Sequence, residues 1–396
     1  MRKGVFQPVF YDALNEEQKS KVLRTLMFLK LKRDGRLKSR LAVDGRPQAF
    51  FGSSMDVSSP TVSAESVFVT LTIDAHEGRE VAVGDIEGAY VEAFMEEEVH
   101  VELDHVLTEL VLTLRPEWKQ FVRPNGRIVF LLVKALYGCI QSARLFYNLL
   151  SHTLRSIGFE ANPYDTCVFN KSFDGKQCTI AVYVDDLKVS CVDAGVVDAV
   201  ISELQQHFTK ITVKRGKHLQ YLGMDLDFSH QGKVIVSMEA MVKEIVKEMY
   251  SEETTVHARV AATPAACHLF KVDPLGSKLQ KEKKEKFHSM VAKLLYLSKH
   301  GRPDILTAVS FLTTRVLHPD EDDWKKLERV ISYLSGTTSL TLTLEAEDLR
   351  EVHGYVDASH ALHPDAKSHT GLVVTLGRGA VLSKSSKQKR VSAQEK

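Results

Sequence analysis

The sequence predicts an α+β fold in which a β-rich first half is followed by a mainly helical segment. Residues 81–85 form an apolar run that ends in an acid, and residues 180–189 form two apolar runs around the tetrad Tyr183-Val-Asp-Asp186. The second pattern is typical of a β-hairpin with its acids at the tip. After residue 280, apolar residues recur three times at helical spacing.

Composition limits the classes of function. The 396 residues support two to three domains, and an apolar content of 44% supplies ample core. With 52 basic and 51 acidic residues, the chain must bind any nucleic acid through local patches, which argues against a simple coating protein. The five cysteines lack CxxC spacing, which argues against a zinc ribbon and predicts a reducing compartment, the cytoplasm. No apolar run approaches the ~20 residues of a membrane span, so we expect no membrane partner.

The hairpin acids predict a cation site. Two carboxylates about 4 Å apart repel by roughly 4 kcal/mol at a surface-like dielectric, so a fold that fixes Asp185 beside Asp186 usually holds cations there. Asp85, at the end of its own strand, supplies a third carboxylate. Mg²⁺ prefers such oxygens, and paired metals serve phosphoryl transfer. A solvated acidic turn is the alternative.

An aromatic residue follows the first acid. Gly88 and Ala89 would let a ligand approach the backbone closely, and Tyr90 would place a flat ring beside that ligand. A core tyrosine beyond a buried strand is the alternative for this segment.

These segments together resemble the reverse transcriptases of copia-type retrotransposons. Asp85-Ile-Glu-Gly-Ala-Tyr90 and Tyr183-Val-Asp-Asp186 resemble the polymerase palm. Further matching segments occur in the family's order: Arg33 to Gly45, Lys134 to Arg144, Gln220-Tyr-Leu-Gly-Met224, Leu294 to Ser298, Arg302-Pro-Asp-Ile305 and Tyr333-Leu-Ser-Gly336. The resemblance implies a polymerase right hand of fingers, palm and thumb, with a helical connection.

The resemblance also implies roles for single residues. Asp85, Asp185 and Asp186 would be catalytic metal ligands for Mg²⁺, with Mn²⁺ as an alternative, and Asp186 would lie closer to the primer end. Tyr90 would exclude a ribose 2′-hydroxyl, and Gln141 would touch the nucleotide. The partners would be an RNA template, a DNA or RNA primer and deoxynucleoside triphosphates, in the cytoplasm or a virus-like particle.

Two basic residues fit the same site. Lys38 and Arg40 lie two residues apart on a predicted strand, so their side chains point to one face and could pair with triphosphate oxygens. A solvated basic strand is the alternative.

The order of segments predicts three parts. Residues 1–230 would form fingers and palm, residues 231–345 a mostly helical thumb and connection, and residues 346–396 a ribonuclease H-like segment. The three predicted helices of the middle part carry apolar stripes that begin at Phe287, follow Pro303 and follow Pro319. Acids at residues 320–323 would complement the dipole of the third helix, which would stop at Gly336.

The last segment resembles the opening strands of a ribonuclease H, with Asp357 and Glu395 at that family's first two acidic positions. Because the printed sequence ends one residue after Glu395, we expect this unit to be truncated, poorly packed from about residue 350 and without ribonuclease H activity. His353, His360, His363 and His369 gather here, and an exposed loop explains them better than a metal site.

The predicted function is therefore RNA-directed DNA polymerisation by two-metal phosphoryl transfer. The main alternative is a decayed or domesticated copy that binds RNA–DNA hybrid without catalysis, and another is a polymerase that copies DNA or needs no template. Lys188 stands where an apolar residue is expected after the hairpin, which slightly favours decay.

Overall fold

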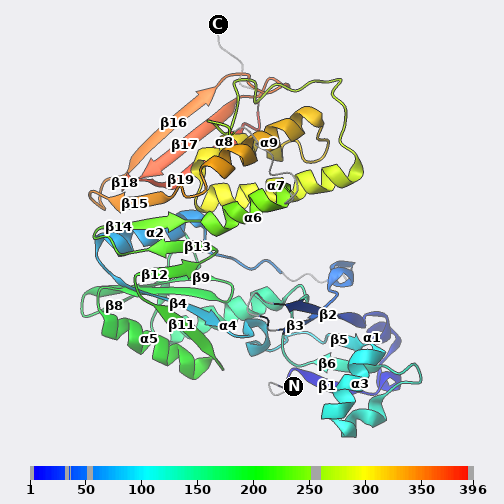
Figure 1. Ribbon diagram of the computed structural model, residues 1–396. Helices are drawn as coiled ribbons and strands as arrows, with labels where there is room; N and C mark the ends of the chain where they lie inside the picture. Colours follow the sequence, from blue (N-terminus) through cyan, green and yellow to red (C-terminus); the bar gives the residue numbers. More distant parts are fainter. Residues whose placement is uncertain (1–3, 32–34, 36, 51–56, 251–259, 391–396) are drawn as a thin grey trace.

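The computed structural model describes residues 4–31, 35, 37–50, 57–250 and 260–390. Over these residues the strands form four sheets, and the helices of residues 239–336 gather in the upper half of the molecule as drawn in Figure 1. The predicted mixture of sheets and helices is confirmed. Short 3-10 turns connect the larger elements: η1 (Tyr11–Ala13), η2 (Arg46–Phe50), η3 (Ala89–Glu92), η4 (Pro116–Phe121) and η6 (Pro303–Ile305).

The N-terminal sheet has the strand order β1-β6-β5-β2-β3. Its strands are β1 (Phe6–Val9), β2 (Leu23–Leu31), β3 (Leu37–Val43), β5 (His100–Leu103) and β6 (Ile128–Leu132), and its helices are α1 (Glu16–Ser20) and α3 (His105–Leu114). β2 pairs with β5 only at its start, whereas its pairing with β3 runs from Thr25 opposite Val43 to Leu31 opposite Leu37. The two strands therefore extend from the sheet as an exposed ribbon that carries the predicted basic pair.

The central sheet has the order β11-β4-β10-β9-β8-β7. Its strands are β4 (Glu80–Ile86), β7 (Glu160–Ala161), β8 (Val168–Phe173), β9 (Lys176–Tyr183), β10 (Asp186–Cys191) and β11 (Ile211–Arg215). Helices α2 (Ala64–His76), α4 (Ser142–Ser156) and α5 (Ala194–His207) pack against it. Most residues of β4 and β10 are buried, because both faces of these strands are covered.

Helix α2 is buried on nearly all sides because it lies between the central sheet and three strands of other sheets, namely β14 (Lys233–Ser237), β15 (Leu342–Ala346) and β19 (Ala380–Lys387). One acid in this helix, Asp74, is 1% exposed, and the Nζ of the fully buried Lys188 on β10 donates to its Oδ2. A buried charge is tolerated when it has a charged partner. Lys188 stands where the sequence predicts an apolar residue, and its ion pair with Asp74 of α2 explains its presence there.

This ion pair makes a testable prediction about stability. Lys188→Met should lower the free energy of unfolding by about 3–5 kcal/mol, because it leaves the Asp74 carboxylate buried without its cation. The double variant Lys188→Met with Asp74→Leu should recover most of that loss, because well-packed apolar side chains commonly replace a buried ion pair at little cost. Urea unfolding of the two variants measures the difference. Equal destabilisation of both would contradict this account.

The helical unit stands on a third sheet of order β12-β13-β14-β15-β18. Its strands are β12 (His218–Tyr221), β13 (Met224–Asp227), β14 (Lys233–Ser237), β15 (Leu342–Ala346) and β18 (Gly377–Arg378). The helices are α6 (Glu239–Met249), α7 (Lys281–His300), α8 (Leu306–Thr313) and α9 (Glu321–Gly336). The three predicted helices are confirmed as α7, α8 and α9, and Asp320 caps α9 as part of a capping box with Asp323. α7 begins before Phe287 because its first residues are charged helix formers without an apolar stripe.

The C-terminal sheet consists of β16 (His353–Ser359), β17 (His369–Thr375) and β19 (Ala380–Lys387), in that order from the edge. β16 is exposed at every residue, as expected for poorly packed chain. For the rest of this sheet the expectation of poor packing is wrong, because β19 packs on α2 and α8 and buries Val381. The surface that covers β19 belongs to α2 and α8, which lie elsewhere in the sequence, so the sequence of this segment alone does not reveal it.

The expectation of an exposed histidine loop is also wrong for two of its members. His363 and His369 are 4% and 7% exposed, and His363 Nε2 lies 3.0 Å from His369 Nδ1. His369 Nε2 in turn lies 2.7 Å from Ser385 Oγ on β19. Burial lowers the pKa of both imidazoles, so they serve as a neutral hydrogen-bonded pair inside the C-terminal sheet.

The described residues contain two hydrophobic clusters. One belongs to the N-terminal sheet, and the other runs from Val62 to Val381 through the central sheet, the helical unit and the C-terminal sheet. The predicted domain boundaries at residues 230 and 345 remain predictions. In the part of the chain that the structure describes, no helix combines the length and the apolar character needed to cross a bilayer.

Candidate functional site

The predicted hairpin is confirmed as β9 and β10. Tyr183 pairs with Asp186, which leaves Val184 and Asp185 as a two-residue turn. Val184 has φ of +56°, a conformation that is unusual for a β-branched side chain. A positive φ at the first turn residue alone is the pattern of a type II′ turn, where Gly is preferred. The turn is therefore strained, and strain of this kind clusters at functional sites.

The strand pairing brings the three predicted acids together. Asp85 on β4 lies directly opposite Asp186 on β10 in an antiparallel register, so both side chains project from the same face. The backbone N–H of Ile86 donates to the carbonyl of Asp185 at 3.0 Å, which fixes the turn against the end of β4. One carboxylate from β4 and two from the hairpin thus share one edge of the central sheet.

The fold penalises the ionised form of both hairpin acids. Burial, followed by the charges of Asp185 and Asp85, raises the pKa of Asp186 to about 6. Burial and the charge of Asp85 also raise the pKa of Asp185, against the opposing effect of Arg40 and Lys38. Burial and a neighbouring negative charge both penalise the ionised form of a carboxyl group. A bound cation would remove that penalty.

The donor set fits a hard divalent cation such as Mg²⁺, which takes carboxylate oxygens. Among the described residues, no three histidine, cysteine, aspartate or glutamate side chains already stand in an arrangement that could hold a metal ion. The fit rests on the chemistry of the three carboxylates and on the raised pKa values of Asp185 and Asp186.

Tyr90 lies near the hairpin, in the short helix η3 that follows Gly88. Burial and then the charge of Asp185 raise the pKa of its hydroxyl. Its ring centre lies 4.5 Å from that of Tyr137 and 6.3 Å from that of Phe146. Tyr90 is thus half-buried, packed against two aromatic rings and within electrostatic reach of Asp185.

Tyr137 is a site residue that the sequence did not single out. The guanidinium carbon of Arg40 lies 4.4 Å above its ring, so Tyr137 stands between Arg40 and Tyr90. Its carbonyl accepts from the N–H of Val43 at 2.7 Å, which ties the loop to β3. An aromatic residue before Gly138 carries no periodic signal, so only the fold could place Tyr137 here.

Backbone contact fixes this loop against the N-terminal sheet. A Cβ on Gly138 would lie 1.9 Å from the carbonyl oxygen of Val43, and a Cβ on Gly45 would lie 1.9 Å from that of Gly138. Gly138 also has φ of +94°. Both positions therefore require glycine, because only glycine permits so close an approach of two backbones.

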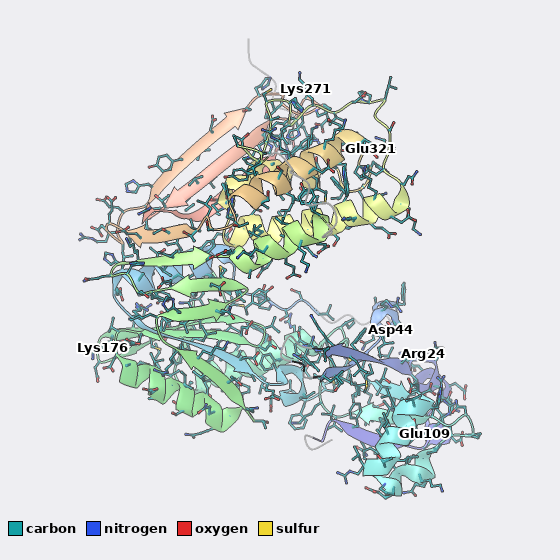
Figure 2. The ribbon with its side chains drawn as sticks, in the orientation of Figure 1. Arg24, Asp44, Glu109, Lys176, Lys271 and Glu321 are labelled. Atoms are coloured by element: carbon teal, nitrogen blue, oxygen red, sulfur yellow. The ribbon has the colours of Figure 1, made fainter. Side chains whose placement is uncertain are left out.

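Lys38 and Arg40 are exposed on β3, opposite Lys30 and Phe28. Alternation along the strand turns both side chains to one face, as predicted. Both lower the pKa of Asp185, so the ribbon of β2 and β3 brings positive charge toward the hairpin. Figure 2 agrees with this arrangement: Lys176, at the start of β9, lies on the side of the central sheet away from that ribbon, so the hairpin at the other end of β9 points toward it.

Gln141 precedes α4 as its N-cap residue and is 4% exposed. Its Oε1 accepts from Gln48 Nε2 at 3.2 Å, and Gln48 Oε1 accepts from the N–H of Ile140 at 3.1 Å. Gln141 also lines a cavity of about 440 Å³, together with Gln48 and His100. The structure thus buries Gln141 beside Gln48 and close to His100 of the N-terminal sheet.

The ribonuclease H-like acids lie elsewhere. Asp357 is exposed on β16, opposite Gly371 of β17, in a different sheet from the three clustered acids. Glu395 lies outside the described residues.

The raised pKa of Asp186 makes a prediction about pH. The folded chain holds this proton more tightly than the unfolded chain, so its contribution to stability is lost as pH rises from about 4 to about 6. In metal-free buffer, Asp186→Asn should raise the midpoint of thermal unfolding above pH 6 by ~2 °C or more and have no effect below pH 4.

The matched control is Asp227→Asn. Hydrogen bonds from Ser229 lower the pKa of Asp227, so removing this charge should not stabilise the fold at any pH. An Asp186→Asn variant with the wild-type midpoint from pH 4 to pH 8 would show that burial and the neighbouring acids do not penalise the ionised Asp186 carboxylate as described.

Comparison with known proteins gives one family. Residues 11–265 match the family model described as "Reverse transcriptase (RNA-dependent DNA polymerase)". The chain is 28% identical over 382 residues to the Retrovirus-related Pol polyprotein from transposon TNT 1-94 of Nicotiana tabacum, covering 93% of this chain and 27% of the polyprotein. It is 30% identical over 266 residues to a putative transposon Ty5-1 protein of Saccharomyces cerevisiae, covering 67% of this chain and 83% of that protein.

Two further matches extend the comparison. The Pol polyprotein from transposon RE2 of Arabidopsis thaliana is 26% identical over 358 residues, and the chain spans 23% of its length. The chain therefore spans about a quarter of the two polyproteins named here. A foamy viral protease-reverse transcriptase solved with double-stranded DNA matches at a TM-score of 0.44 and 12% identity, over 97% of this chain and 58% of that one.

Proposed function

This chain belongs to the reverse transcriptase family, in its copia-type branch, and from that premise we propose that it is an RNA-directed DNA polymerase. In this proposal the 3′-hydroxyl of a primer attacks the α-phosphate of a deoxynucleoside triphosphate on an RNA template, and pyrophosphate leaves. The observation that carries the proposal is the register that sets Asp85 opposite Asp186, with Asp185 in the adjoining turn. The N-terminal and central sheets would then act as fingers and palm.

Each group around the hairpin has a role in this reaction. Asp85, Asp185 and Asp186 would hold Mg²⁺, which when bound polarises phosphoryl oxygens and stabilises developing negative charge. Lys38 and Arg40 would attract the triphosphate, because they are the basic residues whose charges reach Asp185. Tyr137 would keep the Arg40 guanidinium in place by stacking against it.

Tyr90 would set the choice of sugar. Its ring packs against Tyr137 and Phe146, so it cannot swing aside freely when a nucleotide enters. A flat, fixed ring near Asp185 leaves space for a deoxyribose, and a 2′-hydroxyl would collide with it. Gln141 would act indirectly, because Gln48 and Gln141 support the loop that carries Tyr137.

The proposal predicts that Asp185→Asn lowers primer extension on an RNA template by at least about a hundredfold at saturating Mg²⁺. The change removes one charge of the site without changing the size of the side chain. Asp193→Asn is the control, since Asp193 follows the opposite end of β10 and pairs with Lys176 at 2.7 Å. Near-normal extension by Asp185→Asn would refute the assignment of the hairpin acids.

The template requirement is tested in the same assay. Extension on an RNA template by the wild-type chain supports the proposal, and extension on a DNA template alone would make the chain a DNA-directed polymerase. Binding of an RNA–DNA hybrid with no extension on either template would instead identify a non-catalytic binding protein.

A separate prediction concerns sugar selection. Tyr90→Val should raise the incorporation of ribonucleotides relative to deoxynucleotides by about tenfold or more, because the ring that excludes the 2′-hydroxyl is gone. Tyr90→Phe keeps the ring and should keep the wild-type ratio. The ratio of kcat/KM values for the two nucleotides is the measurement, with the thermal midpoint recorded alongside. A lower midpoint with an unchanged ratio would make Tyr90 a core residue only.

A further inference from the structure

A second cluster of reactive side chains lies in the C-terminal sheet, and the proposed polymerase reaction does not use it. His369 begins β17, Ser385 lies on β19, and His363 belongs to the loop between β16 and β17. The register pairs Gly371 with Ser385, so His369 lies two positions from the partner of Ser385. The side chains of His369 and Ser385 therefore share one face of the sheet.

Short distances join the three side chains in one hydrogen-bonded series. Ser385 Oγ lies 2.7 Å from His369 Nε2, and His369 Nδ1 lies 3.0 Å from His363 Nε2. An activated nucleophile has the same arrangement: a hydroxyl, an imidazole within hydrogen-bond reach and a third group that orients the imidazole. His363 takes the place that a carboxylate has in the Ser-His-Asp arrangement.

The geometry places the hydroxyl proton of Ser385 for transfer. This hydroxyl has two acceptors within reach, His369 Nε2 at 2.7 Å and Thr307 Oγ1 at 3.3 Å, and the shorter distance favours the imidazole. When the hydroxyl donates to Nε2, His369 carries its own proton on Nδ1 and donates it to His363 Nε2. His369 Nε2 is then a base that faces the Ser385 hydroxyl.

Burial keeps both imidazoles in the form that accepts a proton. Both are buried, and the ring of Phe270 meets them edge-on, with its centre 5.2 Å from that of His363 and 5.1 Å from that of His369. Burial lowers the pKa of both imidazoles. Positive charge on His369 or Lys387 lowers the pKa of His363 further, and the charge of Asp365 opposes this effect. His369 is therefore neutral near neutral pH, and a neutral imidazole can act as a general base.

The Ser385 hydroxyl lies where this buried pair meets the surface. Ser385 is only partly buried, and Thr307 on α8 and Lys384 on β19 are exposed. Ser310 donates its hydroxyl to the carbonyl of Ser385 at 2.7 Å, which holds this residue against α8. A small molecule can thus reach Ser385 Oγ while the base behind it stays out of water. The Thr307 hydroxyl, 3.3 Å from Ser385 Oγ, can donate to an oxygen that becomes negative when Ser385 attacks.

We propose that Ser385 is a nucleophile that takes acyl groups from small carboxylic esters, with His369 as its general base and His363 as the residue that positions His369. Ser385 Oγ forms a bond to the carbonyl carbon of the ester while His369 Nε2 takes the hydroxyl proton. The bond from that carbon to the leaving oxygen then breaks, and the same proton passes to the leaving alcohol. In the second half, water attacks the acyl group on Ser385 with the help of the same base, and the carboxylic acid leaves. This activity is separate from the proposed polymerase function.

The test treats the full chain with 4-nitrophenyl acetate and maps the acetyl groups by mass spectrometry at early times. Ser335 on α9 is the internal reference, because it is also partly buried and its Oγ donates to the carbonyl of Ser332 at 2.8 Å instead of an imidazole. We expect Ser385 to be acetylated about a hundredfold faster than Ser335, which is the size of a general-base effect. Equal rates at the two serines would overturn the proposal.

The pH dependence of this rate identifies a general base without any substitution. The reaction needs the neutral imidazole of His369, and burial lowers its pKa from the ordinary value of 6.5, so the rate at Ser385 should level off above about pH 7. A hydroxyl without a base reacts through its alkoxide, and its rate rises about tenfold with each pH unit. A rate at Ser385 that rises in this way up to about pH 9 would contradict the role of His369.

Substitutions then separate the roles of the two histidines. His369→Gln keeps a hydrogen-bonding side chain but removes the base, so it should slow acetylation of Ser385 about a hundredfold and leave Ser335 unchanged. His363→Leu should slow it about tenfold or more, and His363→Gln, which keeps an acceptor for the His369 Nδ1 proton, should restore most of the rate.

The thermal midpoint of each variant is recorded alongside. Wild-type acetylation of Ser385 in a folded His369→Gln variant would overturn the proposal, and equal rates in the two His363 variants would refute the positioning role of His363. If the variants do not fold, the pH dependence of the wild-type chain decides between the two results.

Discussion

The antiparallel pairing of β4 with β10 is the constraint on which the candidate site depends. It sets Asp85 opposite Asp186, and the hydrogen bond from the Ile86 N–H to the Asp185 carbonyl fixes the turn beside the end of β4. Like charges opposite each other destabilise a sheet, so this register has to be maintained by other contacts. The buried faces of both strands provide them, together with the ion pair between Lys188 and Asp74 of α2.

The hairpin that carries the acids and the turn between β12 and β13 are both strained. Val184 and Leu222 both adopt positive φ values that their side chains disfavour. Neither strain is relieved locally, so each depends on contacts from distant parts of the chain: β4 for the first and α7 for the second. Contacts between elements that are far apart in the sequence thus maintain both turns.

The sequence predicted the hairpin and the three helices because their apolar periods are local properties. It also grouped Asp85 with the hairpin acids, but it did not predict the register that sets Asp85 opposite Asp186, since the pairing of residues so far apart in the chain depends on the whole fold. The same limit explains why Tyr137 was missed and why Lys188 was interpreted as a sign of decay. The role of each residue depends on a partner far away in the sequence: Arg40 for Tyr137 and Asp74 for Lys188. The residues that bury His363 and His369 also lie in other parts of the chain, so the sequence of the histidine segment did not predict their burial.

In the proposed mechanism, Asp85 and the hairpin acids act together as one cation site. Mn²⁺ binding, measured by electron paramagnetic resonance on the metal-free chain, tests it without requiring catalysis. If the three carboxylates share the cation, Asp85→Asn should weaken Mn²⁺ binding by about tenfold or more, although Asp85 lies on a separate strand from the hairpin. Binding by Asp85→Asn with the wild-type affinity would contradict the account.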